Sequence, residues 1–350
     1  MFSIPKMIHQ IRSGKFTIEA QQLQQIANRL VKNWSLLESP GLWHGKMGIA
    51  LFFFNYARYT GKELFEDYAM EVIESIHANI SWESMTDYED GLTGIGVGIE
   101  YLSQNGFLEI DADEILEDID MRIQNEIIMQ KHENKSIGRG LSGLGKYLLF
   151  RLNNRLPAGA SELHWLINHE RMIHLVNKLE NESIPLPKEL PDVVSLLCNV
   201  YRLSICNLKI ERYFDKILKN FSIDNIETEY LFAWVLALLR LVSIGNQKIE
   251  LVDKIIDLAL QAIESVEVSS ENGIINQLLW LLQCKRLLAQ TELSMSFKNR
   301  IVALVNKIYK QMDDIFLENI ELSLQGCAGT GIAIMTISGF CDGAWLDLLM

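Results

Sequence analysis

Residues 41–62, GLWHGKMGIALFFFNYARYTGK, contain the pattern from which the architecture of this chain follows. A short glycine-containing turn, 44–48, leads into an apolar run of helix length, 49–59. That run has apolar side chains on nearly every side, which is typical of a helix enclosed by other helices. The glycines allow a sharp turn and a close start of the helix. A repeat of this unit would therefore predict a set of enclosed helices.

The glycine turn recurs along the chain at a period of about 50 residues, which is typical of repeat architectures. Copies stand at 91–96 (GLTGIG), 140–145 (GLSGLG) and 326–331 (GCAGTG), and Gly273 marks a weaker one. Between turns, apolar residues recur at helical spacing with acidic residues on the opposite face, as in 64–76, which indicates an outer amphipathic helix. Few segments show the alternation of strands, so we expect an all-α chain.

Seven outer and inner segments alternate, and we expect each outer segment to pair with the inner segment that follows it. The expected pairs are 18–34 with 47–59, 63–80 with 93–105, 111–131 with 142–153, 160–181 with 191–204, 208–221 with 227–243, 247–268 with 272–288, and 295–316 with 326–338. Uniformly apolar inner helices favour a closed ring over an open solenoid, whose concave face would stay wet. The prediction is one (α/α) toroid domain over 1–350, of about seven inner and seven outer helices, with the glycine turns around a central cavity.

Composition excludes several kinds of partner. The formal net charge is −13 and 49% of residues are apolar, so a large core can form, but the clustered cations that nucleic acid requires are not expected. No apolar run approaches the roughly 20 residues that span a bilayer, and the amino terminus lacks a signal-peptide core. Five cysteines without paired spacing suit a reducing compartment. We therefore expect a cytoplasmic protein that binds neither nucleic acid nor membrane.

The glycine turns and their flanks resemble the lanthionine synthetase C (lanthionine cyclase-like) family. The segments that carry the resemblance are HGKMGIALFFFNYARYTGK (44–62), DYEDGLTGIGVGIEYL (87–102), GRGLSGLGKYLL (138–149) and LQGCAGTGIAIM (324–335). The resemblance implies a toroid with its active site at the glycine turns and a peptide substrate or small ligand in the central cavity. Family members hold zinc through a Cys in one glycine turn and a Cys-His pair that opens the final glycine turn. The zinc activates a substrate thiol.

The family's zinc ligands are replaced here. Alignment on Gly326 places Leu324 and Gln325 where the Cys-His pair belongs, and alignment on Gly273 places Glu271 at the other Cys. We therefore expect no metal site and no cofactor. The resemblance then predicts a zinc-less accessory or inactive relative that acts in lanthipeptide-type modification or binds a peptide, in association with other peptide-modifying enzymes.

Asp87 is the candidate catalytic residue, because it stands four residues before the second glycine turn, where the family carries an acid. With Glu89 and Asp90 it forms an acidic cluster in which neighbouring carboxylates raise one another's pKa. The alternative is that Asp90 or Thr93 caps the next helix and the others are solvated. The other candidates at the cavity mouth are His44, Gln325 and Cys327, the last as a buried small residue or as a thiol activated by a helix start.

Two other functions stay open at this point. A carbohydrate-active toroid could use Asp87 or Glu89 as a general acid, since two carboxylates are the usual requirement for glycosidic cleavage. A scaffold without chemistry is the other. The acidic run 109–120, EIDADEILEDID, lacks the glycine and the final glutamate of a calcium loop. We therefore expect this run to be the solvated face of an outer helix.

Overall fold

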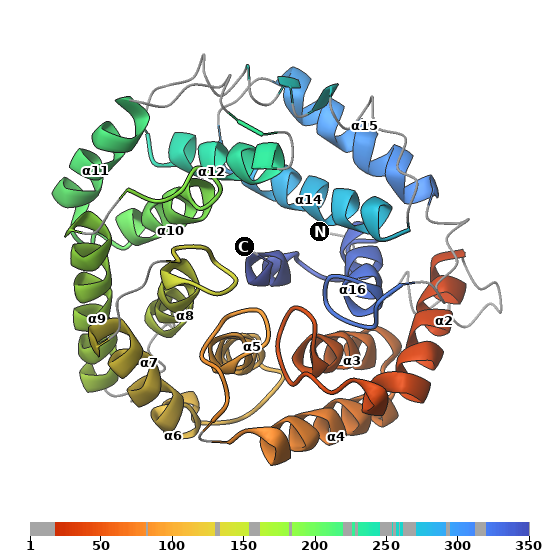
Figure 1. Ribbon diagram of the computed structural model, residues 1–350. Coiled ribbons are helices and arrows are strands. Elements are labelled where there is room, and N and C mark those ends of the chain that lie inside the picture. The colour runs from red at the N-terminus through yellow and green to blue at the C-terminus, as the bar shows by residue number, and fades with distance from the viewer. Residues whose placement is uncertain are drawn as a thin grey trace.

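The computed structural model describes residues 18–81, 83–129, 134–153, 162–181, 184–219, 226–227, 230–245, 254, 257–258, 260–261, 271–291, 295–311 and 320–349. These residues contain α-helices and no β-strand, which confirms the all-α prediction. Viewed along its axis, the protein is a ring of helices in two layers (Figure 1). None of the described helices is long and apolar enough to cross a membrane.

Among the described residues, the inner layer consists of seven helices. They are α3 (Lys46–Thr60), α5 (Leu92–Gln104), α8 (Leu141–Asn153), α10 (Leu190–Arg202), α12 (Leu231–Ser243), α14 (Glu271–Leu288) and α16 (Cys327–Ile337). Of these, α3, α5, α8 and α16 begin at a glycine turn. Each inner helix packs on the next, and α16 packs on α3, so that the ring closes. Residues 46–57 of α3 are all buried, as the apolar run after the first turn predicts.

The outer layer covers the inner one. It is made of α2 (Ile18–Asn33), α4 (Glu63–Asn79), α6 (Ala112–Ile115), α7 (Glu117–Met129), α9 (Glu162–Asn181), α11 (Asn207–Lys219) and α15 (Met295–Gln311). The expected helix over 111–131 is divided in two, because the chain leaves the helical path at Leu116. Asp111 caps the first piece by accepting hydrogen bonds from the backbone of Asp113 and Glu114. Most of the expected outer helix over 247–268 lies outside the described residues.

Outer helices pack mainly on the inner helix that precedes them, which corrects the expected pairing. The physical reason is the length of the connections. Only Gly61 and Lys62 separate α3 from α4, with Gly61 in the left-handed conformation at φ 66°. Such a short link forces antiparallel neighbours, whereas the connection to the next inner helix contains the glycine turn. The first outer helix, α2, consequently packs on α16 from the opposite end of the chain.

Glycine is required in these turns because the chain passes very close to the starts of α3, α5, α8 and α16. A Cβ at Gly94 would lie 2.1 Å from the carbonyl oxygen of Tyr88, and one at Gly329 would lie 1.7 Å from that of Leu324. The next glycine along α5 serves a different contact, since a Cβ at Gly96 would lie 2.5 Å from the ring of Tyr147 on α8. The turns therefore set both the start of each helix and its distance from its neighbour.

The carboxyl-terminal segment occupies the middle of the ring. After α16 the chain returns toward the axis as the short 3₁₀-helix η6 (Ala344–Leu348), which lies at the centre of Figure 1. Trp345 is fully buried there. The carbonyl oxygen of Leu348 accepts hydrogen bonds from Trp43 Nε1 at 3.0 Å and from the Tyr88 hydroxyl at 2.9 Å. The residues that precede the first and second glycine turns thus hold the carboxyl-terminal segment on the ring axis.

Candidate functional site

Backbone hydrogen bonds join the glycine turns to one another around the ring. The Gln325 amide donates to the carbonyl of Trp43 at 3.4 Å, and the Trp43 amide donates to the carbonyl of Glu89 at 2.9 Å. The Tyr88 amide in turn donates to the carbonyl of Gly138 at 2.8 Å. The last, first, second and third turns therefore form one hydrogen-bonded arc, and Glu89 and Gln325 belong to it through their backbones.

Asp87 stabilises the second turn. Its Oδ1 accepts a hydrogen bond from the Asp90 amide at 2.8 Å. Its Oδ2 is buried and has no hydrogen-bond partner among the described residues. The side chain lines a pocket of about 400 Å³ between the second turn, the third turn and α7, together with Arg122, Glu126 and Arg139. Asp87 therefore faces a pocket away from the ring axis.

Glu89 and Asp90 also hold neighbouring turns. Arg139 Nε of the third turn lies 2.8 Å from Glu89 Oε2. Asp90 Oδ1 accepts a hydrogen bond from the Ser39 hydroxyl, which precedes the first turn, at 2.9 Å. The two carboxylates thus bind groups on opposite sides of the second turn, and each has a partner of its own.

His44 and Cys327 lie near the last turn in different surroundings. His44 Nδ1 is 3.7 Å from a carboxylate oxygen of Glu321, and both side chains reach solvent. The Cys327 side chain is fully buried at the start of α16. Burial raises the pKa of its thiol to about 11, although Arg29 acts in the opposite direction. This position therefore does not provide an activated thiol, because the effect of burial on the pKa exceeds the opposing effect of Arg29.

The last turn does not fit a zinc ion. Leu324 is fully buried against the first turn. A Cβ added at Gly48 would lie 2.6 Å from the Cβ of Leu324. Gln325 offers an amide instead of an imidazole. Within the part of the chain that the structure describes, no three His, Cys, Asp or Glu side chains lie where they could hold a metal. The side chain of Glu271 lies outside that part.

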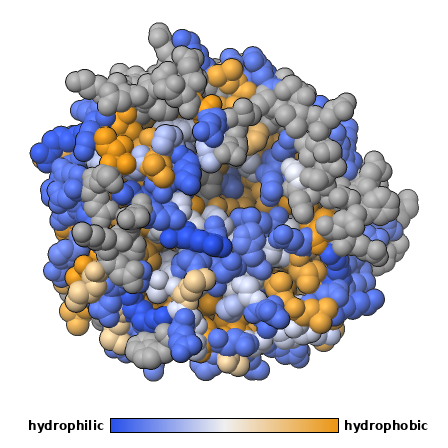
Figure 2. Space-filling view, in the orientation of Figure 1, coloured by the Kyte–Doolittle hydropathy of each residue, from blue (hydrophilic) through white to orange (hydrophobic). Residues whose placement is uncertain are grey.

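An axial cavity of about 760 Å³ opens at the opposite end of the ring, where the inner helices finish. Its lining combines residues of five inner helices with residues of η6 and of the segment that leads into it. The charged lining residues are Lys146, Arg202, Arg240, Arg286, Asp342 and Asp347, and Tyr101, Leu149, Phe150 and Leu287 provide apolar surface. Figure 2 looks onto the other face of the ring, which carries the glycine turns, and hydrophilic residues gather over the middle of that face.

Lys146 and Arg240 are buried at the bottom of the axial cavity, while Arg202 lies at its exposed rim. Burial lowers the pKa of the Lys146 ammonium to about 7; Asp347 opposes the shift and Arg240 adds to it. Burial also lowers the pKa of Arg240. Asp347 Oδ2 lies 2.6 Å from Arg286 Nη2. The cavity is therefore a cationic site inside an acidic protein.

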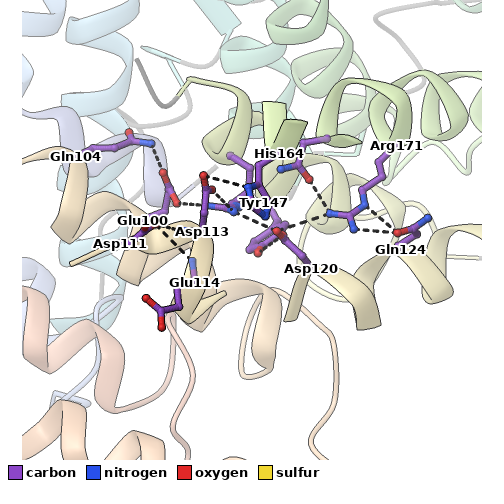
Figure 3. Close-up of polar contacts among 12 residues, drawn as sticks. Glu100, Gln104, Asp111, Asp113, Glu114, Asp120, Gln124, Tyr147, His164 and Arg171 are labelled. Atoms are coloured by element: carbon purple, nitrogen blue, oxygen red, sulfur yellow. Dashed lines mark hydrogen bonds and ion pairs between the residues drawn. The ribbon is translucent and has the colours of Figure 1, made fainter. Parts of the chain in front are cut away.

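A second cluster of buried charges lies between the layers and has a structural role (Figure 3). Arg151 Nη1 lies 2.8 Å from Glu100 Oε2, and its Nη2 lies 2.6 Å from Asp113 Oδ1 and 3.0 Å from Asp120 Oδ2. The Tyr147 hydroxyl donates to Asp120 Oδ1 at 2.6 Å. The expectation that the acidic run 109–120 is wholly solvated is wrong for Asp113 and Asp120, because the division of the outer helix at Leu116 turns both toward Arg151.

Neither the axial cavity nor the Arg151 cluster is predicted by the glycine pattern. Arg202, Arg240 and Arg286 are far apart in sequence, and each stands near the carboxyl end of an inner helix. A search for cations at equivalent ends of successive inner segments would have found them. The C-terminal segment is not part of the repeat, so the sequence pattern does not predict its position on the ring axis.

Comparison with known proteins agrees with the geometry. The model of the family described as lanthionine synthetase C-like protein matches residues 37–184, which hold the first three glycine turns with α3, α5 and α8. No curated protein matches the chain. Over residues 37–184, which hold the first three glycine turns of the helical ring, this chain is similar to the lanthionine synthetase C-like family.

Proposed function

We propose that this protein binds a peptide in its axial cavity and does so without zinc chemistry, as an accessory relative of the lanthionine cyclases. The axial cavity carries the proposal. Its volume, about 760 Å³, falls in the range that holds a drug-sized ligand, and so accommodates the end of a peptide. The exposed rim admits a ligand from outside the ring, and the apolar walls can bury part of it.

The glycine turns favour binding over cyclisation. Leu324 replaces a family zinc ligand and is buried by the first turn, while Leu348 at the chain's end receives hydrogen bonds from Trp43 and Tyr88 on the axis. A thiol could not approach an activating metal at that position without moving η6. The Asp87 carboxylate remains a candidate acid in its own pocket, and Asp87→Asn tests it once a reaction is known.

The test is peptide binding by fluorescence anisotropy. The probes are labelled twelve-residue peptides that tile the short open reading frames flanking the gene. We expect at least one to bind, and we expect Asn199→Trp, which fills the cavity from α10, to weaken that binding by about tenfold or more, or about 1.4 kcal/mol.

The matched control is Asn79→Trp, an exposed position at the end of the outer helix α4, which should bind like the unaltered protein. Folding of all three proteins is checked by circular dichroism. Failure of every peptide to bind the folded protein contradicts the proposal, and so does equal binding by the Asn199→Trp variant.

A further inference from the structure

We propose that the axial cavity selects anionic ligands, so that the peptide it takes presents carboxylate or phosphate groups to Arg240 and Arg202. Only the peptide nature of the ligand rests on the proposed function. The cavity would bind a small anion whether or not the protein binds peptides. The observations that carry it are the charges of the lining residues and the state of one buried guanidinium.

The lining of the cavity has a cationic excess. Four basic side chains, Lys146, Arg202, Arg240 and Arg286, face two carboxylates, those of Asp342 and Asp347. Asp347 is engaged with Arg286 at 2.6 Å, and Asp342 Oδ1 accepts a hydrogen bond from the Ala344 amide at 2.8 Å. The chain as a whole carries a formal charge of −13, so this excess opposes the overall charge and is local to the cavity.

Arg240 is the side chain that most directly calls for a ligand. It is only 4% exposed, and its Nη1 has no hydrogen-bond partner among the described residues. A buried polar group without a partner destabilises a fold, and a guanidinium matches the two oxygens of a carboxylate or phosphate in a bidentate geometry. An anion entering from the rim at Arg202 would supply the missing acceptor.

Helix ends explain only part of this arrangement. Inner helices finish at the cavity, and their carboxyl ends favour cations. Arg202 and Arg240 stand in the last turns of α10 and α12. A helix end does not require burial of the charge, however, and an exposed side chain would satisfy it equally well. The burial of Arg240 at the cavity therefore points to a bound anion.

The test compares two octapeptides by isothermal titration calorimetry at constant ionic strength. One peptide has Glu at two positions where the other has Gln, and the other six residues are identical. We expect the Glu peptide to bind at least tenfold more tightly. Arg240→Gln should remove this preference. Arg202→Gln, whose side chain is exposed, should reduce it severalfold without a risk to folding, and Arg212→Gln on the outer helix α11 should leave it unchanged.

Inorganic phosphate and succinate are titrated separately to distinguish the two sources of negative charge. Tighter binding of phosphate assigns the site to phosphorylated ligands, and tighter binding of succinate assigns it to carboxylates; both support the inference. If the Glu and Gln peptides bind equally, the charge selection is wrong while peptide binding stands. If phosphate or succinate binds and no peptide does, the anion site stands and the proposed function is wrong.

Discussion

Arg151 shows how one buried cation can join both layers of the ring. Its guanidinium contacts Glu100 on α5, Asp113 on α6 and Asp120 on α7, and neither its own side chain nor that of Glu100 is exposed. Removal of one partner from a buried ion pair leaves the other charges uncompensated, which costs more than the pair contributes. This residue therefore holds the α5–α8 part of the ring against its outer cover.

We expect Arg151→Met to lower the free energy of unfolding by about 3–5 kcal/mol, because three carboxylates lose their common partner. Urea denaturation measures the change. Arg139→Gln is the control, since the Arg139–Glu89 pair is exposed on the arginine side and its loss should leave the unfolding midpoint nearly unchanged. Equal effects of the two substitutions would show that the buried cluster has no special role.

Lys146 should make stability depend on pH. Its pKa is about 7 in the folded protein and about 10.4 in an unfolded chain. Between these values the unfolded chain binds one more proton, so stability rises with pH, by up to about 1.4 kcal/mol per unit. Below pH 7 both states hold the proton and the contribution to the slope vanishes.

Lys146→Met should remove that rise, which denaturation at pH 6, 7, 8 and 9 would reveal as a flatter stability curve above pH 7. Lys62→Met, an exposed position between α3 and α4, serves as the control and should keep the slope. If the stability curves of the Lys146→Met variant and the unaltered protein are parallel, the pKa of Lys146 is not lowered toward 7 in the folded protein.

At the scale of elements, the inner helices are predictable and the axial segment is not. A glycine turn before a run such as 49–59 has few structural solutions, because only glycine tolerates a carbonyl oxygen as close as that of Tyr88 to Gly94. Asp113 and Asp120 are turned toward Arg151 because the outer helix breaks at Leu116. The spacing of the acidic residues does not predict that break. The axial place of η6 depends on contacts with residues distant in sequence, such as those of Leu348 with Trp43 and Tyr88, so no local pattern contains it.

Trp345 tests the role of the axial segment. It is fully buried in η6, and its Nε1 donates to the Thr336 hydroxyl at 2.9 Å. We expect Trp345→Ala to cost about 3–5 kcal/mol of stability, because a large cavity opens on the axis. Trp165→Ala on the outer helix α9, where the side chain is 38% exposed, should cost much less. A small effect at Trp345 would mean that the segment does not fill the axis in solution.

At the scale of the whole molecule, the ring closes through contact between elements from opposite ends of the chain. Ile26 of α2 is fully buried, and its Cγ2 lies 3.3 Å from where a Cβ at Gly331 of α16 would stand. Closure removes the exposed edge that an open solenoid would need to cap. It also brings the last glycine turn beside the first, which places Gln325 against Trp43.

Hydrogen exchange can detect this closure. Ile26→Ala should speed amide exchange in α16, which is about 300 residues away in sequence but shares a locally opening unit with α2. Val72→Ala, at a fully buried position of α4, should act on α3 instead. Faster exchange of α3 alone in both variants would indicate that α2 covers the inner helix that follows it and that the ring is open.

The expectation that this protein works without zinc is tested most directly by metal content. The protein is purified untagged without chelators, incubated with excess zinc, dialysed and analysed by plasma mass spectrometry. Because Leu324 and Gln325 provide no zinc-binding side chain and burial raises the pKa of the Cys327 thiol, we expect far less than one zinc per chain. One tightly bound zinc per chain would contradict this, since the ligands would then have to come from a site that the glycine-turn alignment does not identify, and cyclase chemistry would return as the function.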